Sequence, residues 1–343
     1  MTSTVPFVKG GNELLAQTLI RQLERRGHEA QLLTVPQNQF GRQFSAYLAA
    51  LLTDVRFEGC VERVDQVISL KFPSFAVRHP AHVCWFNHRM REYYDLWDRF
   101  SSRLTSSRQL IKERIRRKAL HAMDTYLLKK NVTKLYAQSK TVQKRLRRFG
   151  NITSEVLYPA ATDLVQCEEY SYGKFILSPG RLVDLKRHDL LIRALGNLQR
   201  SGVHAIIAGG GPQQNELKGL VERLGLKKRV KFAGEMDYDT LSQYYSTCLA
   251  VFYGPFSEDY GLVTLEASKC HKAVITCTDS GGPTELVRHG ATGLVCEPDE
   301  TAIAEAIDRL SANPDQAESL GQAAYEASLE HGWDNAIERL LIV

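Results

Sequence analysis

Residues 255–270 read PFSEDYGLVTLEASKC and hold two carboxylates, Glu258 and Glu266, on either side of Gly261. On one continuous helix, the eight steps between the acids would set their side chains about 80° apart, so they would not share a face. We therefore predict that a helix begins just after Gly261, with Glu258 on the preceding loop and Glu266 on the second turn. The backbone N–H groups of the first turn then form an anion-binding site with one acid on each side.

The chain has the length and composition of a two-domain globular protein. It has 343 residues, of which 43% are hydrophobic and 24% charged, and a net charge of +5. The sequence contains no run of about 18 apolar residues, and its start, MTSTVPFVKGG, lacks the features of a secretory signal. The seven cysteines include no C-x-x-C pair. We therefore expect a cytoplasmic protein with free, buried thiols and no metal site.

Short apolar runs alternate with helical stretches along the whole chain. In the first half, a helical apolar stripe at residues 14–23 precedes a strand at 30–35, and three further apolar runs follow. In the second half the expected strands are KFILSPG, HAIIAGGG, VKFAGE, LAVFYGP, AVITC and TGLVC, with helices between them. This alternation is typical of a parallel, doubly wound sheet, and it predicts an α/β fold with two Rossmann-like domains facing each other across a cleft.

The alternation breaks once, near residues 158–172, where the sequence reads like a linker. We therefore predict an N-terminal Rossmann-like domain over residues 1–158. A C-terminal Rossmann-like domain would cover 159–328. Residues 329–343 would form a C-terminal helix that packs back on the N-terminal domain.

Five segments lie where a strand hands over to a helix, which is where open α/β sheets bind ligands. Each segment alone is a weak signal, because a glycine pair before a helix is more often a plain turn. Together they place glycine turns, an arginine and a lysine at the mouth of one sheet, which suits a nucleotide-sugar. The segments are Gly10-Gly11, GRLVDLKRHDLL with Arg181 and Lys186, the run Gly209, Gly210 and Gly211, SEDYGLVTLE, and SGGPTEL.

The order and spacing of these motifs resemble those of the retaining GT-B glycosyltransferases of family 4, glycosyl transferases group 1. The resemblance rests on SPGRLVDLKRHDLLIRAL, IIAGGGP, VKFAGE, SEDYGLVTLEASKC and SGGPTELVRHGATGLV, and on PFVKGGNELLAQTLIRQLERRGHEAQLLTV near the start. Residues 37–148 match only loosely. The resemblance implies the GT-B fold and a retaining hexosyltransferase. It also implies that the N-terminal domain binds the acceptor and that the C-terminal domain binds the nucleotide-sugar. Such an enzyme would move a sugar from a nucleotide-sugar to a saccharide or lipid-linked acceptor in polysaccharide or glycolipid synthesis.

The resemblance also implies roles for the candidate residues. Arg181 and Lys186 would bind the donor diphosphate, where charge grows as the nucleotide departs. Glu266 would accept hydrogen bonds from the ribose hydroxyls, and Glu258 would contact the transferred sugar. The other donor-binding residues would hold a phosphate or border the nucleoside, largely through their backbone: Gly10, Gly11, Gly209, Gly210, Gly211, Glu235, Met236, Gly261, Leu262 and Val263.

His88 ends the expected strand HVCWFNH. In the resembling family a residue at this strand end often lies beside the transferred sugar, which implies a catalytic role. The alternative is an ordinary core or surface histidine. Nearby, Arg91, Tyr93 and Trp97 would either frame an acceptor or form one face of an amphipathic helix. The predicted catalytic residues are thus His88, Arg181, Lys186 and Glu258.

No metal or other cofactor is expected, because arginine, lysine and helix N-termini can neutralise the donor phosphates. The resemblance implies front-face departure and attack, so we assign no enzymic nucleophile. Residues 237–239, DYD, imitate a D-x-D metal motif. They lie at an expected helix start, and we interpret the first aspartate as an N-cap.

The start of the chain departs from the family pattern. Family members open with an apolar strand before the first glycine loop, whereas here Met1 precedes that loop by only a few residues. We therefore expect the first strand to be missing from the N-terminal domain. A start site placed too late explains this best.

Residues 99–148 are crowded with lysine and arginine, as in KERIRRK and KRLRR. They form either the solvated face of helices or a surface for an anionic membrane or phosphorylated acceptor. Nucleic acid is not an expected partner, because no aromatic residues interleave the charges. The sequence is thus consistent with peripheral attachment to the inner face of a membrane.

Three alternative functions remain open at this stage. A glycoside hydrolase would use Glu258 and Glu266 as an acid and a nucleophile, but the phosphate-type motifs would then have no purpose. A GT-B nucleotide-sugar epimerase would transfer nothing to an acceptor. A catalytically degenerate partner subunit would bind the nucleotide-sugar and regulate another transferase.

Overall fold

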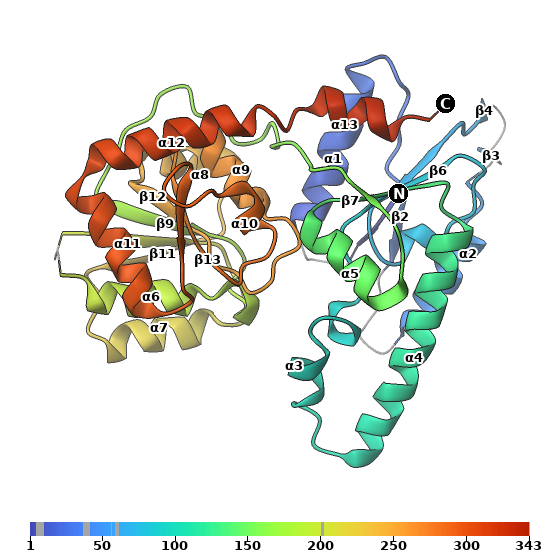
Figure 1. Ribbon diagram of the computed structural model, residues 1–343, viewed down its shortest axis with the longest axis horizontal. Coiled ribbons are helices and arrows are strands. Elements are labelled where there is room, and N and C mark those ends of the chain that lie inside the picture. The colour runs from blue at the N-terminus through green and yellow to red at the C-terminus, as the bar shows by residue number, and fades with distance from the viewer. Residues whose placement is uncertain (5–9, 37–41, 56, 59–61, 200–201, 343) are drawn as a thin grey trace. The chain divides into compact units, whose positions relative to one another are not determined.

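The computed structural model consists of two α/β units (Figure 1). Unit 1 comprises Met1–Pro159 and Trp333–Val343, and unit 2 comprises Ala160–Gly332. The domain boundary that we predicted lies at residue 158. The structure describes residues 1–343 except 5–9, 37–41, 56, 59–61, 200–201 and 343.

Unit 1 is built on parallel strands. One sheet has the order β5-β6-β7-β8, and β1 pairs in parallel with β2. A small antiparallel pair, β3 with β4, was not predicted. The elements are β1 (Thr2–Thr4), α1 (Gly11–Glu24), β2 (Thr34–Pro36), α2 (Gln43–Leu52), β3 (Phe57–Glu58), β4 (Glu62–Arg63), β5 (Val67–Ser69), η1 (Ser74–Ala76), β6 (His82–Phe86), η2 (Arg91–Tyr93), α3 (Trp97–Ser101), α4 (Ser107–Lys130), β7 (Lys134–Ala137), α5 (Lys140–Gly150), β8 (Glu155–Val156) and α13 (Trp333–Leu340).

Strand β1 lies in a segment where we predicted no strand. The Met1 ammonium donates to the Ile68 carbonyl oxygen at 2.6 Å, and the Leu70 N–H donates to the Met1 carbonyl oxygen at 3.2 Å. These bonds link β1 to the β5 region on one side, while β2 pairs with it on the other. The prediction of a missing first strand is therefore wrong. Strand pairing uses backbone groups, so the polar run TST forms a strand without the apolar signal that we sought.

Helix α13 packs within unit 1. The indole ring of Trp333 meets that of Trp85 edge to face, with ring centroids 6.1 Å apart. The side chain of Gln66 donates to the carbonyl oxygen of Leu340 at 2.6 Å. The apolar face of this helix therefore packs against core residues of unit 1 that lie more than 200 positions earlier in the chain.

Unit 2 contains a six-stranded parallel sheet in the order β11-β10-β9-β12-β13-β14. The order reverses between β9 and β12, which is the switch point at which doubly wound sheets bind ligands. The elements are β9 (Phe175–Pro179), η3 (Asp184–Lys186), α6 (His188–Asn197), β10 (His204–Ala208), α7 (Gln214–Arg223), β11 (Val230–Gly234), α8 (Tyr238–Thr247), β12 (Ala250–Phe252), α9 (Leu262–Lys269), β13 (Val274–Cys277), α10 (Pro283–Leu286), β14 (Gly293–Cys296), α11 (Glu300–Ala312) and α12 (Pro314–Ser328).

Helices cover both faces of this sheet (Figure 1). Alternate strand residues point to opposite faces, and each face has its own apolar cluster. Ile176 and Phe252 pack with α6, α7 and α11, whereas Leu177 and Val251 pack with α8 and α9. The near-continuous apolar strands of the sequence therefore form a sheet that is buried on both sides, as expected for parallel strands.

One expectation about the cysteines is wrong. Cys167 and Cys270 form a disulfide within unit 2, with their Cα atoms 5.2 Å apart. The two residues are 103 positions apart, and folding brings the segment after the linker beside the end of α9. Sequence spacing therefore gave no sign of the pair. Cys84, Cys248 and Cys277 are free and buried, as predicted.

Candidate donor site and the cavity around His88

Helix α9 begins at Leu262 with Gly261 as its N-cap, which confirms the prediction from the opening motif. Gly261 has a φ of +94°, and a Cβ atom there would lie 2.9 Å from Pro283 and 3.0 Å from the ring of Tyr253. Only glycine suits both the left-handed backbone and the close approach. The N–H groups of the first turn therefore open toward the carboxyl end of the sheet, at the tip of an intact helix.

Lys186 and Glu258 form the centre of the site in unit 2. The ammonium of Lys186 donates to Glu258 Oε2 and to the hydroxyl of Tyr253, each at 2.7 Å. Burial acts to lower the pKa of Lys186, but the Glu258 carboxylate and the Tyr253 oxygen outweigh it and raise that pKa. Lys186 is therefore a firmly charged cation beside the N-terminus of α9.

Arg187 ties the neighbouring loops together, and the sequence analysis missed it. Its guanidinium binds the Asp279 carboxylate through two nitrogens, at 2.6 and 2.8 Å, and donates to the carbonyl oxygens of Gly254 and Pro255 at 2.8 and 3.0 Å. These contacts join the loops that follow β9, β12 and β13. Arg187 adjoins Lys186, and Asp279 precedes the SGGPTEL motif, so both lay beside motifs that we had already singled out.

Glu266 lies on α9 with only 6% of its surface exposed. Its Oε2 accepts a hydrogen bond from the hydroxyl of Tyr245 at 2.9 Å. Burial raises the pKa of Glu266, while the bond from Tyr245 and the charges of Lys186 and Lys269 act to lower it. The two glutamates thus occupy different environments, one paired with a cation and one buried beside a tyrosine.

The predicted glycine run after β10 packs closely against the neighbouring loops. A Cβ atom on Gly209 would lie 2.1 Å from the carbonyl oxygen of Gly180, and one on Gly211 would lie 2.5 Å from that of Leu182. A Cβ atom on Gly210 would meet the carboxylate of Glu235 at 2.8 Å. The backbones after β9, β10 and β11 therefore approach one another as closely as glycine permits.

The remaining predicted residues of unit 2 border this arrangement. Arg181 is exposed, and its carbonyl oxygen faces the ring of His188 at 3.3 Å. Met236 is partly buried against the core. Asp237 is the N-cap of α8 and accepts a hydrogen bond from the backbone N–H of Thr240 at 2.8 Å, which confirms its interpretation as a cap.

Gly10, Gly11 and His88 belong to unit 1. Gly10 is the exposed N-cap of α1, and Gly11 is its first residue. Residues 5–9 of the first glycine loop lie outside the described residues. His88 follows β6, where its Nδ1 lies 2.7 Å from the carbonyl oxygen of Arg89.

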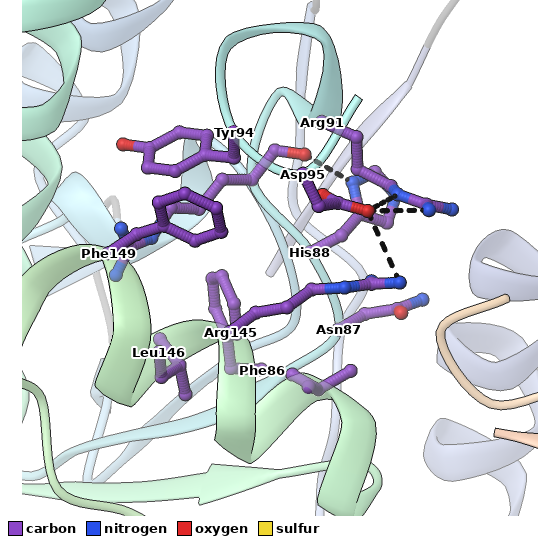
Figure 2. A pocket seen from close by; sticks show the side chains of 11 residues that line it. Phe86, Asn87, His88, Arg91, Tyr94, Asp95, Arg145, Leu146 and Phe149 are labelled. Carbon is purple, nitrogen blue, oxygen red and sulfur yellow. Dashed lines mark hydrogen bonds and ion pairs between the residues drawn. The ribbon is translucent and has the colours of Figure 1, made fainter. Parts of the chain in front are cut away.

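His88 lines a small cavity in unit 1, shown in Figure 2, with about 20 Å³ of space for the centres of water molecules. Asp95 accepts from Arg91 at 2.7 and 3.0 Å and pairs with Arg145 at 3.3 Å. Of the nearby residues that the sequence suggested, only Arg91 lines the cavity, whereas Tyr93 and Trp97 are buried. The lining is Phe86, Asn87, His88, Arg89, Arg91, Tyr94, Asp95, Val142, Arg145, Leu146 and Phe149.

The basic segment 99–148 is divided by its contacts. Arg116 pairs with Glu113 at 2.6 Å, and Arg117 donates to the carbonyl oxygen of Tyr93 at 2.8 Å. Both arginines therefore serve the fold of unit 1. By contrast, α4 carries an exposed face on which Ile111 and Ile115, 57% and 65% exposed, lie among cations. The exposed cations of α4 are Arg108, Lys112, Arg114, Lys118, Lys129 and Lys130.

No described helix is both long and apolar enough to cross a membrane. Within the same residues, no group of three or more histidine, cysteine, aspartate or glutamate side chains is arranged to hold a metal ion.

Residues 165–327 match the sequence model of the family glycosyl transferases group 1. The chain is 30% identical over 206 residues to the human alpha-1,3/1,6-mannosyltransferase ALG2, a match that covers 53% of this chain and 49% of that protein. It is 32% identical over 179 residues to the D-inositol 3-phosphate glycosyltransferase of Mycobacterium leprae, covering 49% and 41%. The chain thus spans about half the length, or less, of the curated relatives that it matches.

Solved structures resemble the chain over nearly its whole length. The Anabaena protein Alr3699/HepE, in complex with UDP and glucose, has a TM-score of 0.70 at 18% identity, with 99% of both chains covered. Sucrose-phosphate synthase of Thermosynechococcus elongatus has a TM-score of 0.75 at 18% identity, covering 99% and 96%. The chain therefore has the α/β fold of GT-B glycosyltransferase structures, with parallel sheets.

Proposed function

We propose that this protein is a glycosyltransferase that moves a sugar from a nucleotide-sugar to a saccharide or lipid-linked acceptor with retention of configuration. The observation that carries the proposal is the pairing of Lys186 with Glu258 beside the N-terminus of α9. The match to glycosyl transferases group 1 supports it, because that match spans the same unit. Neither the epimerase nor the degenerate subunit is favoured.

In this proposal the donor diphosphate binds across the carboxyl ends of β9 and β12. Lys186 and Arg181 bind its phosphates, and the N–H groups of Leu262 and Val263 donate to them from the tip of α9. Negative charge grows on the leaving diphosphate as its bond to the sugar breaks. Fixed cations and dipoles already aimed at that position stabilise the transition state more than the ground state.

The two glutamates then hold opposite ends of the donor. Glu266 accepts hydrogen bonds from the ribose hydroxyls through Oε1, because Tyr245 already donates to Oε2. This role accounts for the burial of Glu266. Glu258 contacts the transferred sugar and pairs with Lys186. The glycine turns at Gly209–Gly211 and the segment at Glu235–Met236 border the nucleoside, where the absence of side chains leaves room for a base.

We infer that transfer needs no metal, because Lys186, Arg181 and the tip of α9 supply positive charge where the phosphates would bind. We assign no nucleophile, so the incoming hydroxyl attacks the face that the diphosphate leaves, and a donor phosphate oxygen takes its proton. The roles of His88, Gly10 and Gly11, which belong to unit 1, stay predictions.

The exposed face of α4 supports contact with an anionic membrane surface. Ile111 and Ile115 are four residues apart and therefore share one side of the helix. Exposed cations flank them at Arg108, Lys112 and Lys118. An apolar stripe among cations is the pattern of a helix that lies in the interface of an anionic bilayer. Such a surface suits a lipid-linked acceptor and a peripheral enzyme at the inner face of a membrane.

A thermal-shift screen against UDP, GDP, ADP and their sugars tests the proposal. A ligand that binds only the folded state raises the melting temperature by mass action, so one nucleotide and its sugars should stand out. Transfer is then tested with that donor and a panel of saccharide and lipid-linked acceptors, with the anomeric configuration read by NMR. The absence of any nucleotide-dependent shift would overturn the proposal.

A further inference from the structure

Arg187 occupies a backbone position that suits glycine. It has a φ of +52° and a ψ of +43°, in the left-handed region, and it is the N-cap of α6. A residue with a side chain is strained in this region, whereas glycine is not. The task of the backbone here is to accept a hydrogen bond from the N–H of Leu190 at 3.1 Å, which needs no side chain. The strain is therefore offset by what the guanidinium contacts.

The guanidinium holds the start of the loop that carries Glu258. Its Nε donates to the carbonyl oxygen of Gly254 at 2.8 Å, and one terminal nitrogen donates to that of Pro255 at 3.0 Å. The N–H of Phe256 donates to the loop after β9 at 2.8 Å, and the ring of Phe256 lies 5.8 Å from the guanidinium carbon. The residues just before Glu258 are therefore fixed to the loop on which Arg187 lies.

The same guanidinium also holds the loop after β13. Its two terminal nitrogens bind the two carboxylate oxygens of Asp279 at 2.6 and 2.8 Å. Along this loop, the N–H of Ser257 donates to the carbonyl oxygen of Asp279 at 2.9 Å, and the N–H of Glu258 donates to that of Ser280 at 2.7 Å. The backbone of Glu258 is thus bonded to a loop that the Arg187 side chain holds in place.

Lys186 has an anchor of its own. Its ammonium donates to the hydroxyl of Tyr253 at 2.7 Å. The N–H of Tyr253 donates to the carbonyl oxygen of Ile275 at 2.9 Å, which continues the pairing of β12 with β13. Loss of the Arg187 side chain would therefore leave the cation anchored to the sheet. The effect would fall on the loop of Glu258.

We propose that Arg187 is a positioning residue that holds Glu258 where the sugar of the donor binds, by joining the loops after β9, β12 and β13. The inference rests on the proposed function, because it presupposes that Glu258 contacts the transferred sugar. Arg187 acts through the backbone of residues 254–258 and through Asp279. It therefore sets the affinity for the sugar half of the donor and leaves the affinity for the nucleotide half nearly unchanged.

Calorimetric titration of the full chain separates the two halves of the donor. The probes are UDP and UDP-glucose, or the nucleotide and nucleotide-sugar that the thermal-shift screen selects in their place. Arg187→Gly removes the side chain and also relieves the backbone, so its effects on stability oppose each other. Its affinity for UDP-glucose should fall about tenfold, because a carboxylate out of position loses its hydrogen bonds to the sugar. Its affinity for UDP should fall less than about twofold.

Asp279→Ala removes the partner of Arg187 from the opposite loop. It should also weaken the binding of UDP-glucose selectively, and the double variant should lose no more than Arg187→Gly alone, because both changes remove one shared contact. Arg193→Gln is the control and should change neither affinity. Arg193 is a half-exposed arginine of α6 that pairs with Asp189 at 3.9 Å.

Two results of the titrations would overturn the inference while the proposed function stands. Equal losses of affinity for UDP and UDP-glucose in Arg187→Gly would show that Arg187 serves the fold of unit 2 as a whole. An unchanged affinity for UDP-glucose would show that Glu258 keeps its position without Arg187.

Hydrogen exchange decides the case in which no nucleotide binds, which is the failure of the proposed function itself. It is measured without nucleotide at the N–H groups of Phe256, Ser257 and Glu258. In Arg187→Gly these groups should exchange at least about tenfold faster, while the N–H of Tyr253 keeps its rate. Faster exchange confined to residues 256–258 supports the positioning of Glu258 whatever the substrate is. Unchanged exchange there, or an equal rise at Tyr253, overturns it.

Discussion

The ammonium of Lys186 lies 2.7 Å from Glu258 Oε2, although 72 positions separate the two residues. One follows β9 and the other follows β12, the two strands between which the order of the sheet reverses. A cation and an anion are therefore in contact at the switch point of the sheet. A diphosphate would compete for the cation and a sugar hydroxyl for the anion, so the pair is already suited to the donor that we propose.

Replacing Lys186 with methionine should abolish most of the nucleotide-dependent thermal shift. We expect the turnover number for transfer to fall at least about 100-fold, the usual loss when one preorganised donor to a developing charge is removed. Lys227→Met is the matched control, because Lys227 is an exposed lysine of the same unit. A Lys186→Met enzyme with wild-type turnover would show that this cation takes no part in the reaction.

Replacing Glu266 with glutamine should separate stability from binding. Burial raises the pKa of Glu266, so the folded state holds its proton more tightly than the unfolded state does. That contribution is fully present below the unfolded pKa and is lost as the pH rises through the folded pKa. Glu266→Gln should therefore raise the melting temperature at pH 7 while weakening nucleotide binding about tenfold, since an amide is a poorer acceptor for two hydroxyls. Paired melting curves with and without nucleotide measure both effects, and a variant that is both less stable and fully binding contradicts this account.

Gly261→Ala should disturb the tip of α9. The new Cβ atom would lie 2.9 Å from Pro283, at a φ of +94° that disfavours side chains. We expect a loss of about 1–2 kcal/mol in the free energy of unfolding, measured with urea, together with weaker nucleotide binding. Gly196→Ala is the control: Gly196 lies in α6, and a Cβ atom there has open space. It should leave stability unchanged or raise it.

The stability of the protein should fall between pH 6.5 and pH 4. Burial lowers the pKa of His188 in unit 2 and of His82 in unit 1, each to about 4. Between pH 6.5 and pH 4, the unfolded chain therefore binds protons at these histidines that the folded units do not bind. The free energy of unfolding is highest above pH 6.5 and decreases as the pH falls toward 4. Each histidine contributes a slope of about 1.4 kcal/mol per pH unit within this window. His188→Gln should remove the contribution of His188 to this slope and leave that of His82 in unit 1 unchanged. Urea unfolding at a series of pH values would measure the difference.

Neutralising exposed cations of α4 should weaken binding to anionic vesicles. Arg116 and Arg117 are unsuitable for this test because they are held by contacts within unit 1. The triple variant Lys112→Gln, Arg114→Gln and Lys118→Gln should instead lower the partition constant on phosphatidylserine vesicles by about 100-fold, because each charge contributes about 1 kcal/mol. Sedimentation with neutral vesicles is the control. Equal partitioning of wild type and variant would assign these cations to the solvated face of the helix.

The sequence by itself determined the alternation of strands and helices, the start of α9 at Gly261 and the cap at Asp237. These features follow from local rules: buried parallel strands must be apolar, helix starts need caps, and close backbone approach needs glycine. The motif order also placed Lys186, Glu258 and Glu266 in one unit, because the carboxyl ends of parallel strands share an edge of the sheet.

Only the tertiary structure decided the rest. It paired Lys186 with Glu258, gave Arg187 its partner Asp279, and closed the Cys167–Cys270 disulfide, all between residues whose sequence spacing carries no signal. It also showed β1 to be a strand held by backbone bonds rather than by apolar side chains.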